Sequence, residues 1–171
     1  SMSMNWWSRP MIFPSRTKKI WTMQSGWHNL PQFDPDGAKY DQQPGAEFAA
    51  ADVTVTDALD GLAMDLAPAY GAVPGLGRYR RSVHLTDAGL TLHDETDYPG
   101  TVALTLMSVE KPAVNGDTVA FGALAAAAVT GADKIVTEAV PITDPRLRQA
   151  WPDTLYRTRI YFTRQLSLVI Q

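Results

Sequence analysis

Apolar and polar residues alternate along most of the chain, which is typical of β-strands that bury one face. Between residues 78 and 86, apolar side chains occupy the odd-numbered positions Tyr79, Val83 and Leu85, while every even-numbered position is polar. An alanine-rich run at 123–129 fits a helix or a strand, and its short length between glycines favours a strand. Strands are expected at residues 20–23, 27–33, 47–57, 62–66, 78–86, 90–93, 102–106, 118–121, 123–129, 134–140, 154–162 and 165–170.

Turn signals separate these segments. The sequences Asp60-Gly61 and Asn115-Gly116 are typical of hairpin loops. From Asp144 to Trp151 the chain differs, because an Asp-Pro start marks a short helical turn that ends before a proline. The pattern predicts an all-β protein, an antiparallel β-sandwich of about ten or more strands with one short helical turn. We expect a single domain over residues 1–171, in which residues 1–15 form an irregular aromatic segment.

Residues 20–32 mix aromatic and polar side chains without helical spacing. They predict two short strand pieces joined at Gly26, with the polar pair His28 and Asn29 beside the aromatic surface of Trp21 and Trp27. Alone, His28 fits either a hydrogen-bonded structural imidazole, which is the more common role, or a ligand. Asn29 could orient its ring in both cases.

Two further histidines fall on a predicted hairpin. A four-residue loop at 87–90 would pair Thr86 with Thr91 and set His84 opposite His93 on the polar face, whereas a shorter loop would offset them by one residue. Such a pair could bind a metal ion or act as an acid and a base, but two exposed imidazoles are the more common outcome. The sequence holds no self-contained zinc motif and no Gly-x-Ser-x-Gly elbow.

Composition narrows the classes of function. The chain is 45% hydrophobic and 19% charged, which is ordinary for a globular protein and argues against disorder. Its net charge of -3 provides no basic field for nucleic acid or anionic membranes. No cysteine is present, and neither a signal peptide nor an apolar run long enough to span a bilayer is found.

Arginine and tryptophan side chains offer a further hint of carbohydrate chemistry. Arginines could bind the carboxylates or sulfates of an acidic sugar, although the solvated faces of edge strands are the more common explanation. Tryptophans could stack on sugar rings, although a β-sandwich normally places them in its core. The residues concerned are Arg78, Arg80, Arg81, Arg157, Arg159, Arg164, Trp6, Trp7, Trp21 and Trp27.

Three blocks of sequence resemble the C-terminal β-sandwich domain of heparinase II/III-like proteins. The first and most specific reads Ile-Trp-Thr-Met-Gln-Ser-Gly-Trp-His-Asn-Leu-Pro, at residues 20–31. The second, at 43–55, reads Gln-Pro-Gly-Ala-Glu-Phe-Ala-Ala-Ala-Asp-Val-Thr-Val. The third spans Asp144 to Trp151 and continues in Leu155-Tyr156-Arg157.

This resemblance implies a role in cleaving uronic-acid-containing polysaccharides by β-elimination. In such lyases a Tyr and other groups of an α/α-toroid act with a His of the β domain, which lies in a Gly-x-His-x-His-type motif. A metal, commonly zinc, is held by the second His of that motif, an Asp further on, and the His of His-Asn, which corresponds to His28. Candidate substrate-binding residues are Trp27, Asn29 and Gln43.

The toroid and the upstream histidine motif have no counterpart in this sequence. We therefore expect a truncated β domain of a bacterial lyase, inactive by itself and without a cofactor, because one imidazole does not hold zinc. Surface left uncovered by the missing N-terminal domain could support self-association. The alternatives are a non-catalytic carbohydrate- or partner-binding module, and a small metalloprotein that uses His84, His93 and a carboxylate. Cytoplasmic and exported locations both stay open.

Overall fold

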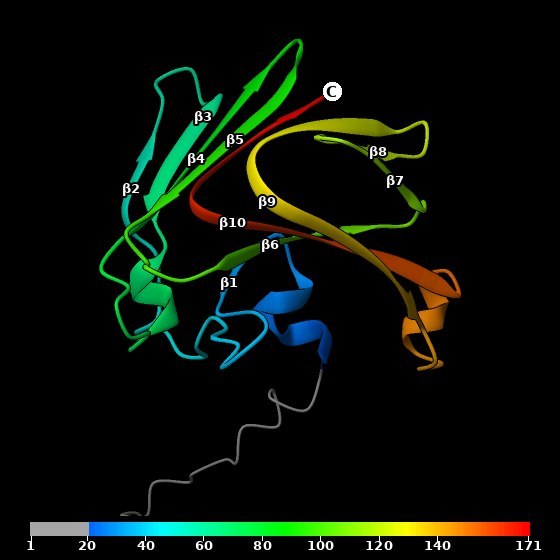
Figure 1. Cartoon of the computed structure of the whole chain (residues 1–171), viewed down its shortest axis with the longest axis horizontal. Helices are drawn as coiled ribbons and strands as arrows, with labels where there is room; N and C mark the ends of the chain where they lie inside the picture. The colour runs from blue at the N-terminus through cyan, green and yellow to red at the C-terminus, as the bar shows by residue number, and fades with distance from the viewer. Residues whose placement is uncertain (1–20) are drawn as a thin grey trace, which may run out of the picture.

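Ten antiparallel strands form one sheet in the computed structural model, which describes residues 21–171 (Figure 1). The predicted all-β class is confirmed, and the described residues contain no helices other than short 3-10 turns. The segment 1–15 lies outside the described residues. The strands are β1 (Pro31–Phe33), β2 (Ala51–Val55), β3 (Gly61–Asp65), β4 (Tyr79–Thr86), β5 (Gly89–Thr96), β6 (Val102–Ser108), β7 (Pro112–Asn115), β8 (Thr118–Phe121), β9 (Ala125–Pro141) and β10 (Thr154–Ile170).

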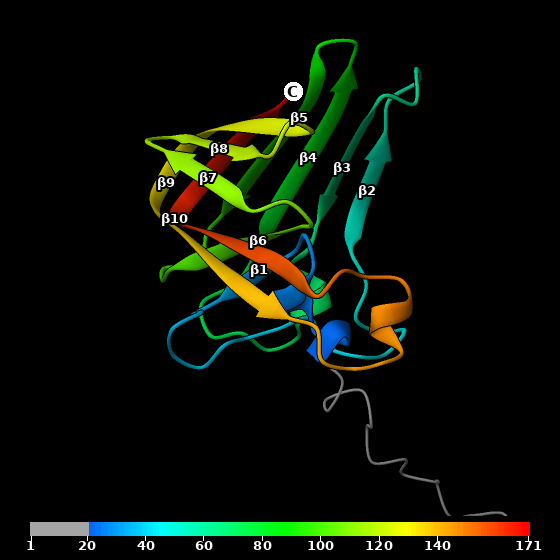
Figure 2. The ribbon, with the colours of Figure 1, turned by 90° about the vertical axis from the view of Figure 1, so that its right-hand side faces the viewer.

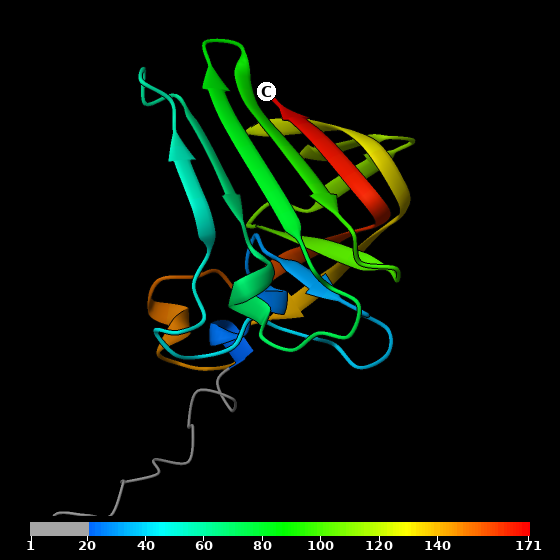
Figure 3. The same ribbon diagram turned by 90° about the vertical axis from the view of Figure 1, so that its left-hand side faces the viewer.

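Strand β10 organises the sheet because it changes its partner halfway along. Its first half, 156–162, pairs with β6, and its second half, 165–170, pairs with β5. Strand β9 pairs with β10 along both halves. One wing of the sheet therefore runs β5-β4-β3-β2 and the other runs β6-β1, and the two wings diverge from β10 (Figures 2 and 3). Strands β8 and β7 continue from the first part of β9.

A bend in β9 and β10 turns this sheet into a sandwich-like fold (Figure 1). The register between the two strands shifts between Tyr161 and Ser167. Arg164 has a φ of 76° and Gly131 a φ of 88°, the left-handed region that glycine tolerates best. The sequence predicted two separate strands in each of these places, at 123–129 and 134–140 and at 154–162 and 165–170, and this division was wrong. Each pair is one continuous bent strand.

Aromatic side chains fill the centre of the core between the wings. The ring of Phe33, which is fully buried, meets the rings of Tyr70, Tyr79 and Tyr98 edge to face, with centroids 4.9 to 5.6 Å apart. Edge-to-face contacts of this kind add to the stabilisation from burying the rings. A smaller apolar cluster around Val140 and Leu155 lies apart from this core.

The first block of the resemblance does not form strands at its start. Residues Trp21–Met23 and Ser25–Trp27 are two 3-10 turns, η2 and η3, and only Pro31–Phe33 is a strand. Their backbone bonds are local, as in the bond from the N–H of Gln24 to the carbonyl of Trp21. The prediction of two strand pieces joined at Gly26 was wrong because local turn bonds, together with contacts of the Gly26 backbone to Asp41 and Arg157, take the place of strand pairing.

The other elements lie close to their predicted positions. The hairpin at Asn115-Gly116 and the strand Thr118–Phe121 are confirmed. The helical turn is a 3-10 turn, η5 (Leu147–Gln149). Another 3-10 turn, η4 (Ala67–Tyr70), lies in a stretch expected to be a loop. The strand expected at 47–57 is shorter, and Asp52, with a φ of 50°, marks a bulge beside the alanines.

Candidate functional site

A pocket of about 290 Å³ lies where the first block meets the ends of β6 and β10. Two of its walls come from η2, η3 and the residues that follow them: Trp21, Thr22, Trp27, His28 and Asn29. Met107 of β6, Leu155 of β10 and Trp151, which follows η5, complete the lining. We call this the tryptophan pocket. It brings together three predicted site residues: Trp27, His28 and Asn29.

Three indole rings define the shape of the tryptophan pocket. Trp21 and Trp27 pack edge to face with their centroids 4.8 Å apart. Trp151 lies 6.5 Å from Trp21 at an angle of 56° between planes and keeps 37% of its surface exposed. The first pair is therefore a packed contact, whereas Trp151 leaves an open side toward solvent.

Arg157 supports Trp27. The guanidinium carbon of Arg157 lies 3.7 Å from the centroid of the Trp27 ring, a favourable cation–π contact. Nη1 of the same side chain donates to the carbonyl of Gly26 over 3.2 Å, and Nε pairs with Glu138. One face of Trp27 and the charge of Arg157 are thus already engaged within the protein.

The imidazole of His28 is exposed and oriented by a single backbone contact. Its Nε2 lies 2.8 Å from the carbonyl oxygen of Thr22. A carbonyl only accepts hydrogen bonds, so Nε2 carries the proton and Nδ1 of the neutral ring keeps its lone pair. Metal-binding histidines commonly have this arrangement, in which a backbone carbonyl fixes the tautomer and the other nitrogen faces outward.

A buried ion pair anchors the backbone next to His28. The carbonyl of Asn29 accepts a 2.7 Å hydrogen bond from Nη1 of Arg81. Nε and Nη2 of Arg81 donate to the two carboxylate oxygens of Asp94 at 2.7 and 2.6 Å, and Tyr79 donates to Asp94 at 2.6 Å. Burial disfavours the charged form of Arg81, but the hydrogen bonds and charge of Asp94 raise its pKa above the usual value. Burial also raises the pKa of Tyr79.

The carboxylate of Asp41 fixes the turn that precedes His28. One oxygen of Asp41 accepts hydrogen bonds from the hydroxyl of Ser25, the N–H of Gly26 and the amide of Gln32, at 2.9 to 3.0 Å. Gln43 belongs to this support and does not line the pocket. Its side chain donates to the carbonyl of Asp41 and its backbone N–H to that of Ala69. Of the four candidate residues that the resemblance supplies, Trp27, His28 and Asn29 line the pocket and Gln43 lies away from them.

The predicted pairing of His84 with His93 was wrong. The β4–β5 loop has two residues rather than four, because Thr86 pairs with Gly89. His93 therefore faces Ser82 and hydrogen-bonds the hydroxyl of Ser167 over 2.8 Å, while His84 lies 3.4 Å from the carboxylate of Asp60. The histidines are diagonal neighbours, each with its own partner.

Residues 21–171 do not by themselves form a metal site. Within residues 21–171, no group of three or more His, Asp, Glu or Cys side chains lies close enough together to hold an ion. A structural zinc takes four ligands, and a catalytic zinc usually takes three from the protein. His28 would supply only one, so no chemical step through a metal follows from the described residues.

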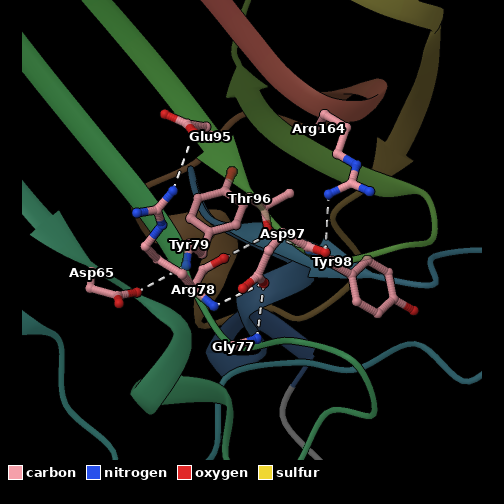
Figure 4. Close-up of polar contacts among 9 residues, drawn as sticks. All are labelled: Asp65, Gly77, Arg78, Tyr79, Glu95, Thr96, Asp97, Tyr98 and Arg164. Atoms are coloured by element: carbon pink, nitrogen blue, oxygen red, sulfur yellow. Dashed lines mark hydrogen bonds and ion pairs between the residues drawn. The ribbon is translucent and has the colours of Figure 1, made fainter.

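A separate polar network links β3, β4, β5 and the segments next to them (Figure 4). The carboxylate of Asp97 accepts hydrogen bonds from the N–H groups of Gly77 and Arg78, both 2.9 Å long. These bonds, that of Arg78 first, hold the pKa of Asp97 below its usual value. Arg78 also pairs with Glu95 at 3.3 Å.

Sequence reasoning missed half of the lining of the tryptophan pocket. Trp151, Leu155 and Met107 lie more than seventy residues beyond Trp27 in the sequence. The third block contained the only available signal, because Trp151 and Leu155 belong to it. Thr22 was likewise not singled out, since its contribution is a backbone carbonyl.

Comparison with protein-family models gives no match to this chain, and comparison with curated proteins gives none either. Within residues 21–171 there is also no helix with the length and apolar character needed to cross a membrane.

Proposed function

We propose that this chain is the C-terminal β domain of a heparinase II/III-like polysaccharide lyase. The observation that carries the proposal is the orientation of His28, whose Nε2 donates to the carbonyl of Thr22 and whose Nδ1 is left as a free ligand atom. The resemblance assigns to this histidine the role of a metal ligand. A fixed tautomer with one outward-facing nitrogen is what that role requires.

The hydrogen bonds that hold the backbone on either side of His28 also support the proposal, because a metal site must keep its geometry. Arg81 donates to the carbonyl of Asn29 on one side of the histidine. On the other side, the carboxylate of Asp41 accepts hydrogen bonds from the η3 turn. Ligands of a metal or substrate act best when surrounding bonds restrict their positions. In the full-length parent, the remaining ligands and the catalytic groups would come from outside this chain.

The isolated chain is proposed to be inactive. Elimination from a uronic acid needs a general base and a group that stabilises charge at the sugar carboxylate. In the proposal both belong to the toroid and to the upstream histidine motif. Incubation of the purified chain with uronate polysaccharides should therefore give no increase in absorbance from an unsaturated product, and such an increase would refute inactivity.

The class of the parent is tested on the longer reading frame that contains this sequence. We expect it to encode an upstream helical region and a Gly-x-His-x-His-type motif, and its product to cleave a uronate polysaccharide and retain zinc. His28→Ala in that protein should lower the zinc content, whereas His93→Ala should not. A reading frame without these features, or a zinc content independent of His28, would contradict the proposal.

A second candidate function is a non-catalytic carbohydrate- or partner-binding module. The observation that favours it is the tryptophan pocket itself, because indole rings beside exposed polar groups are common in binding sites. Absence of any glycan binding by the isolated chain in calorimetric titration would refute the module. Glycan binding by a longer protein that neither retains zinc nor cleaves uronates would favour the module over the lyase.

A further inference from the structure

We infer that the tryptophan pocket is a subsite for one uncharged pyranose ring. The inference rests on the proposed function only in taking carbohydrate as the class of ligand. The pocket of about 290 Å³ is at the small end of ligand pockets, which run from about 300 to 1,000 Å³. It is therefore suited to a single ring.

The stacking surface is the open side between Trp21 and Trp151. Their centroids lie 6.5 Å apart with planes inclined at 56°, and Trp151 is 37% exposed. Indole faces carry negative partial charge, and the C–H groups on one side of a pyranose carry positive partial charge, so the two surfaces attract. Trp27 is less available, because Arg157 covers one of its faces.

Hydrogen-bonding groups lie at the rim. In the isolated chain, where the other proposed metal ligands are not supplied, Nδ1 of His28 is free to accept because Nε2 bonds to Thr22. The carboxamide of Asn29 is exposed, and among the described contacts only the backbone carbonyl of this residue is engaged. Sugar hydroxyls both donate and accept, so an acceptor beside a carboxamide suits a ring that bears several hydroxyls.

The charges at and near the tryptophan pocket favour a neutral sugar over a uronate or a quaternary ammonium ion as the ligand. None of the described lining residues carries a permanent charge. Arg157, which lies behind Trp27, is already paired with Glu138 and bonded to the carbonyl of Gly26. Among residues 21–171, no free cation lines the pocket to meet a sugar carboxylate. The neighbouring guanidinium of Arg157 disfavours a second cation at the same rings.

The backbone that carries Trp151 is fixed by local contacts. The backbone N–H of Trp151 donates to the carbonyl of Leu147 at 2.9 Å, the carboxylate of Asp144 accepts from the backbone N–H of Arg146 at 2.8 Å, and Arg148 pairs with Asp153. A turn that is already ordered loses less backbone freedom on binding than a disordered one, which improves affinity.

The test is titration of the purified chain with neutral gluco-, manno- and galacto-oligosaccharides. Binding is monitored by tryptophan fluorescence and by the indole N–H signals in NMR. An oligogalacturonate and tetramethylammonium serve as charged probes. We expect a neutral oligosaccharide to shift the indole signals of Trp21 and Trp151, and the charged probes to bind more weakly. Absence of binding by every neutral probe, or preference for a charged one, would overturn the inference.

Variants locate the site. Trp151→Ala should weaken neutral-sugar binding by about tenfold, as expected for loss of one stacking ring, and Trp151→Phe should restore much of it. Leu59→Ala, which truncates an apolar side chain that is 82% exposed in the β2–β3 loop, is the matched control and should bind normally. Circular dichroism of each variant checks folding. Equal binding by wild type and a folded Trp151→Ala variant would place the ligand elsewhere and overturn the inference.

The outcome is distinguishable from that of the proposed function. Neutral-sugar binding that depends on Trp151 can be present in a protein that neither binds zinc nor cleaves uronates. Conversely, a longer protein could cleave uronates through His28 while Trp151→Ala leaves neutral-sugar affinity unchanged. Each result overturns one conclusion and leaves the other standing.

Discussion

At the scale of single residues, the same kind of ion pair has different consequences inside and outside the core. Arg81 and Asp94 have side chains only 7% and 0% exposed, whereas those of Arg78 and Glu95 are 52% and 51% exposed. Water screens the second pair but not the first. The buried pair also holds the carbonyl of Asn29, so its loss reaches the tryptophan pocket.

Replacing Asp94 with asparagine should therefore destabilise the protein strongly. Asp94→Asn leaves the guanidinium of Arg81 buried without a counter-charge, which we expect to lower the free energy of unfolding by about 3 kcal/mol. Glu95→Gln is the matched control and should change it by less than about 1 kcal/mol. Urea unfolding followed by circular dichroism measures both. Similar values for the two variants would show that burial of the pair has no energetic role.

The carboxyl group of Asp97 makes the free energy of unfolding depend on pH, and its pKa fixes the sign of this dependence. Its pKa is lowered in the folded protein, chiefly by the N–H of Arg78, so folding favours the ionised carboxyl. This contribution is present above the unfolded pKa of about 4 and is lost as the pH falls through the folded pKa. Wild type should exceed Asp97→Asn in unfolding free energy at about pH 6, by less than about 1 kcal/mol because the group is exposed. The difference should shrink at about pH 3, and a difference that grew would contradict the assignment.

At the scale of elements, the bend in β9 and β10 decides the fold. It lets β10 pair first with β6 and then with β5, which separates the two wings. Gly131 lies at this bend with a φ of 88°, and a Cβ built on it would lie 2.6 Å from the carbonyl oxygen of Gln165. Both the conformation and the close approach favour glycine here.

Gly131→Ala should consequently weaken the fold by roughly 2 to 3 kcal/mol, because it combines left-handed strain with a backbone clash. Gly116→Ala is the control. Gly116 also has a positive φ, of 57°, but nothing lies within 4 Å of its built Cβ, so only the strain of about 1 kcal/mol applies. Thermal and urea unfolding compare the two. Equal losses would mean that the close approach at Gly131 is relieved without energetic consequence.

Local patterns predicted the elements whose structure depends on near neighbours. The Asn115-Gly116 hairpin forms as expected because its two-residue loop and its alternating strands specify each other. The same patterns split β9 and β10, because a residue such as Arg164 gives no local sign that its strand continues through a bend. Residues 20–32 were assigned as strands because the Asp41 contacts that hold the η3 turn come from another segment.

For the candidate site too, the sequence predicted only the part that is formed by residues adjacent in the chain. Trp27, His28 and Asn29 meet in one pocket because they are adjacent in sequence and belong to one turn. Trp151 joins them only through the pairing of β10 with β6 and β9, which no local spacing reveals. Gln43 was carried over from the second block, and its side chain instead closes the loop at Asp41.

At the scale of the whole molecule, one wing of the sheet has an apolar face that becomes more exposed toward its edge. Directly paired apolar residues cross five strands, from Leu168 through Leu92, Val83 and Leu62 to Val55. Leu168 is 1% exposed, but Val55 on the end strand β2 is 55% exposed and Leu85 on the same face is 59% exposed. Apolar sheet faces beside an unpaired edge strand promote association.

We therefore expect the isolated chain to self-associate as its concentration rises, through this wing. The double variant Val55→Lys and Leu85→Lys places two charges on the apolar face and should keep the chain monomeric at concentrations where wild type sediments faster. Thr54→Lys adds charge to the same edge strand but on the opposite face, so it should behave like wild type. Sedimentation velocity over a concentration series distinguishes the cases. Thr54→Lys and the double variant both add charge to the edge strand β2, but only the double variant adds charge to the apolar face. If Thr54→Lys abolished association as fully as the double variant, the contact would therefore be the edge of β2 rather than the apolar face.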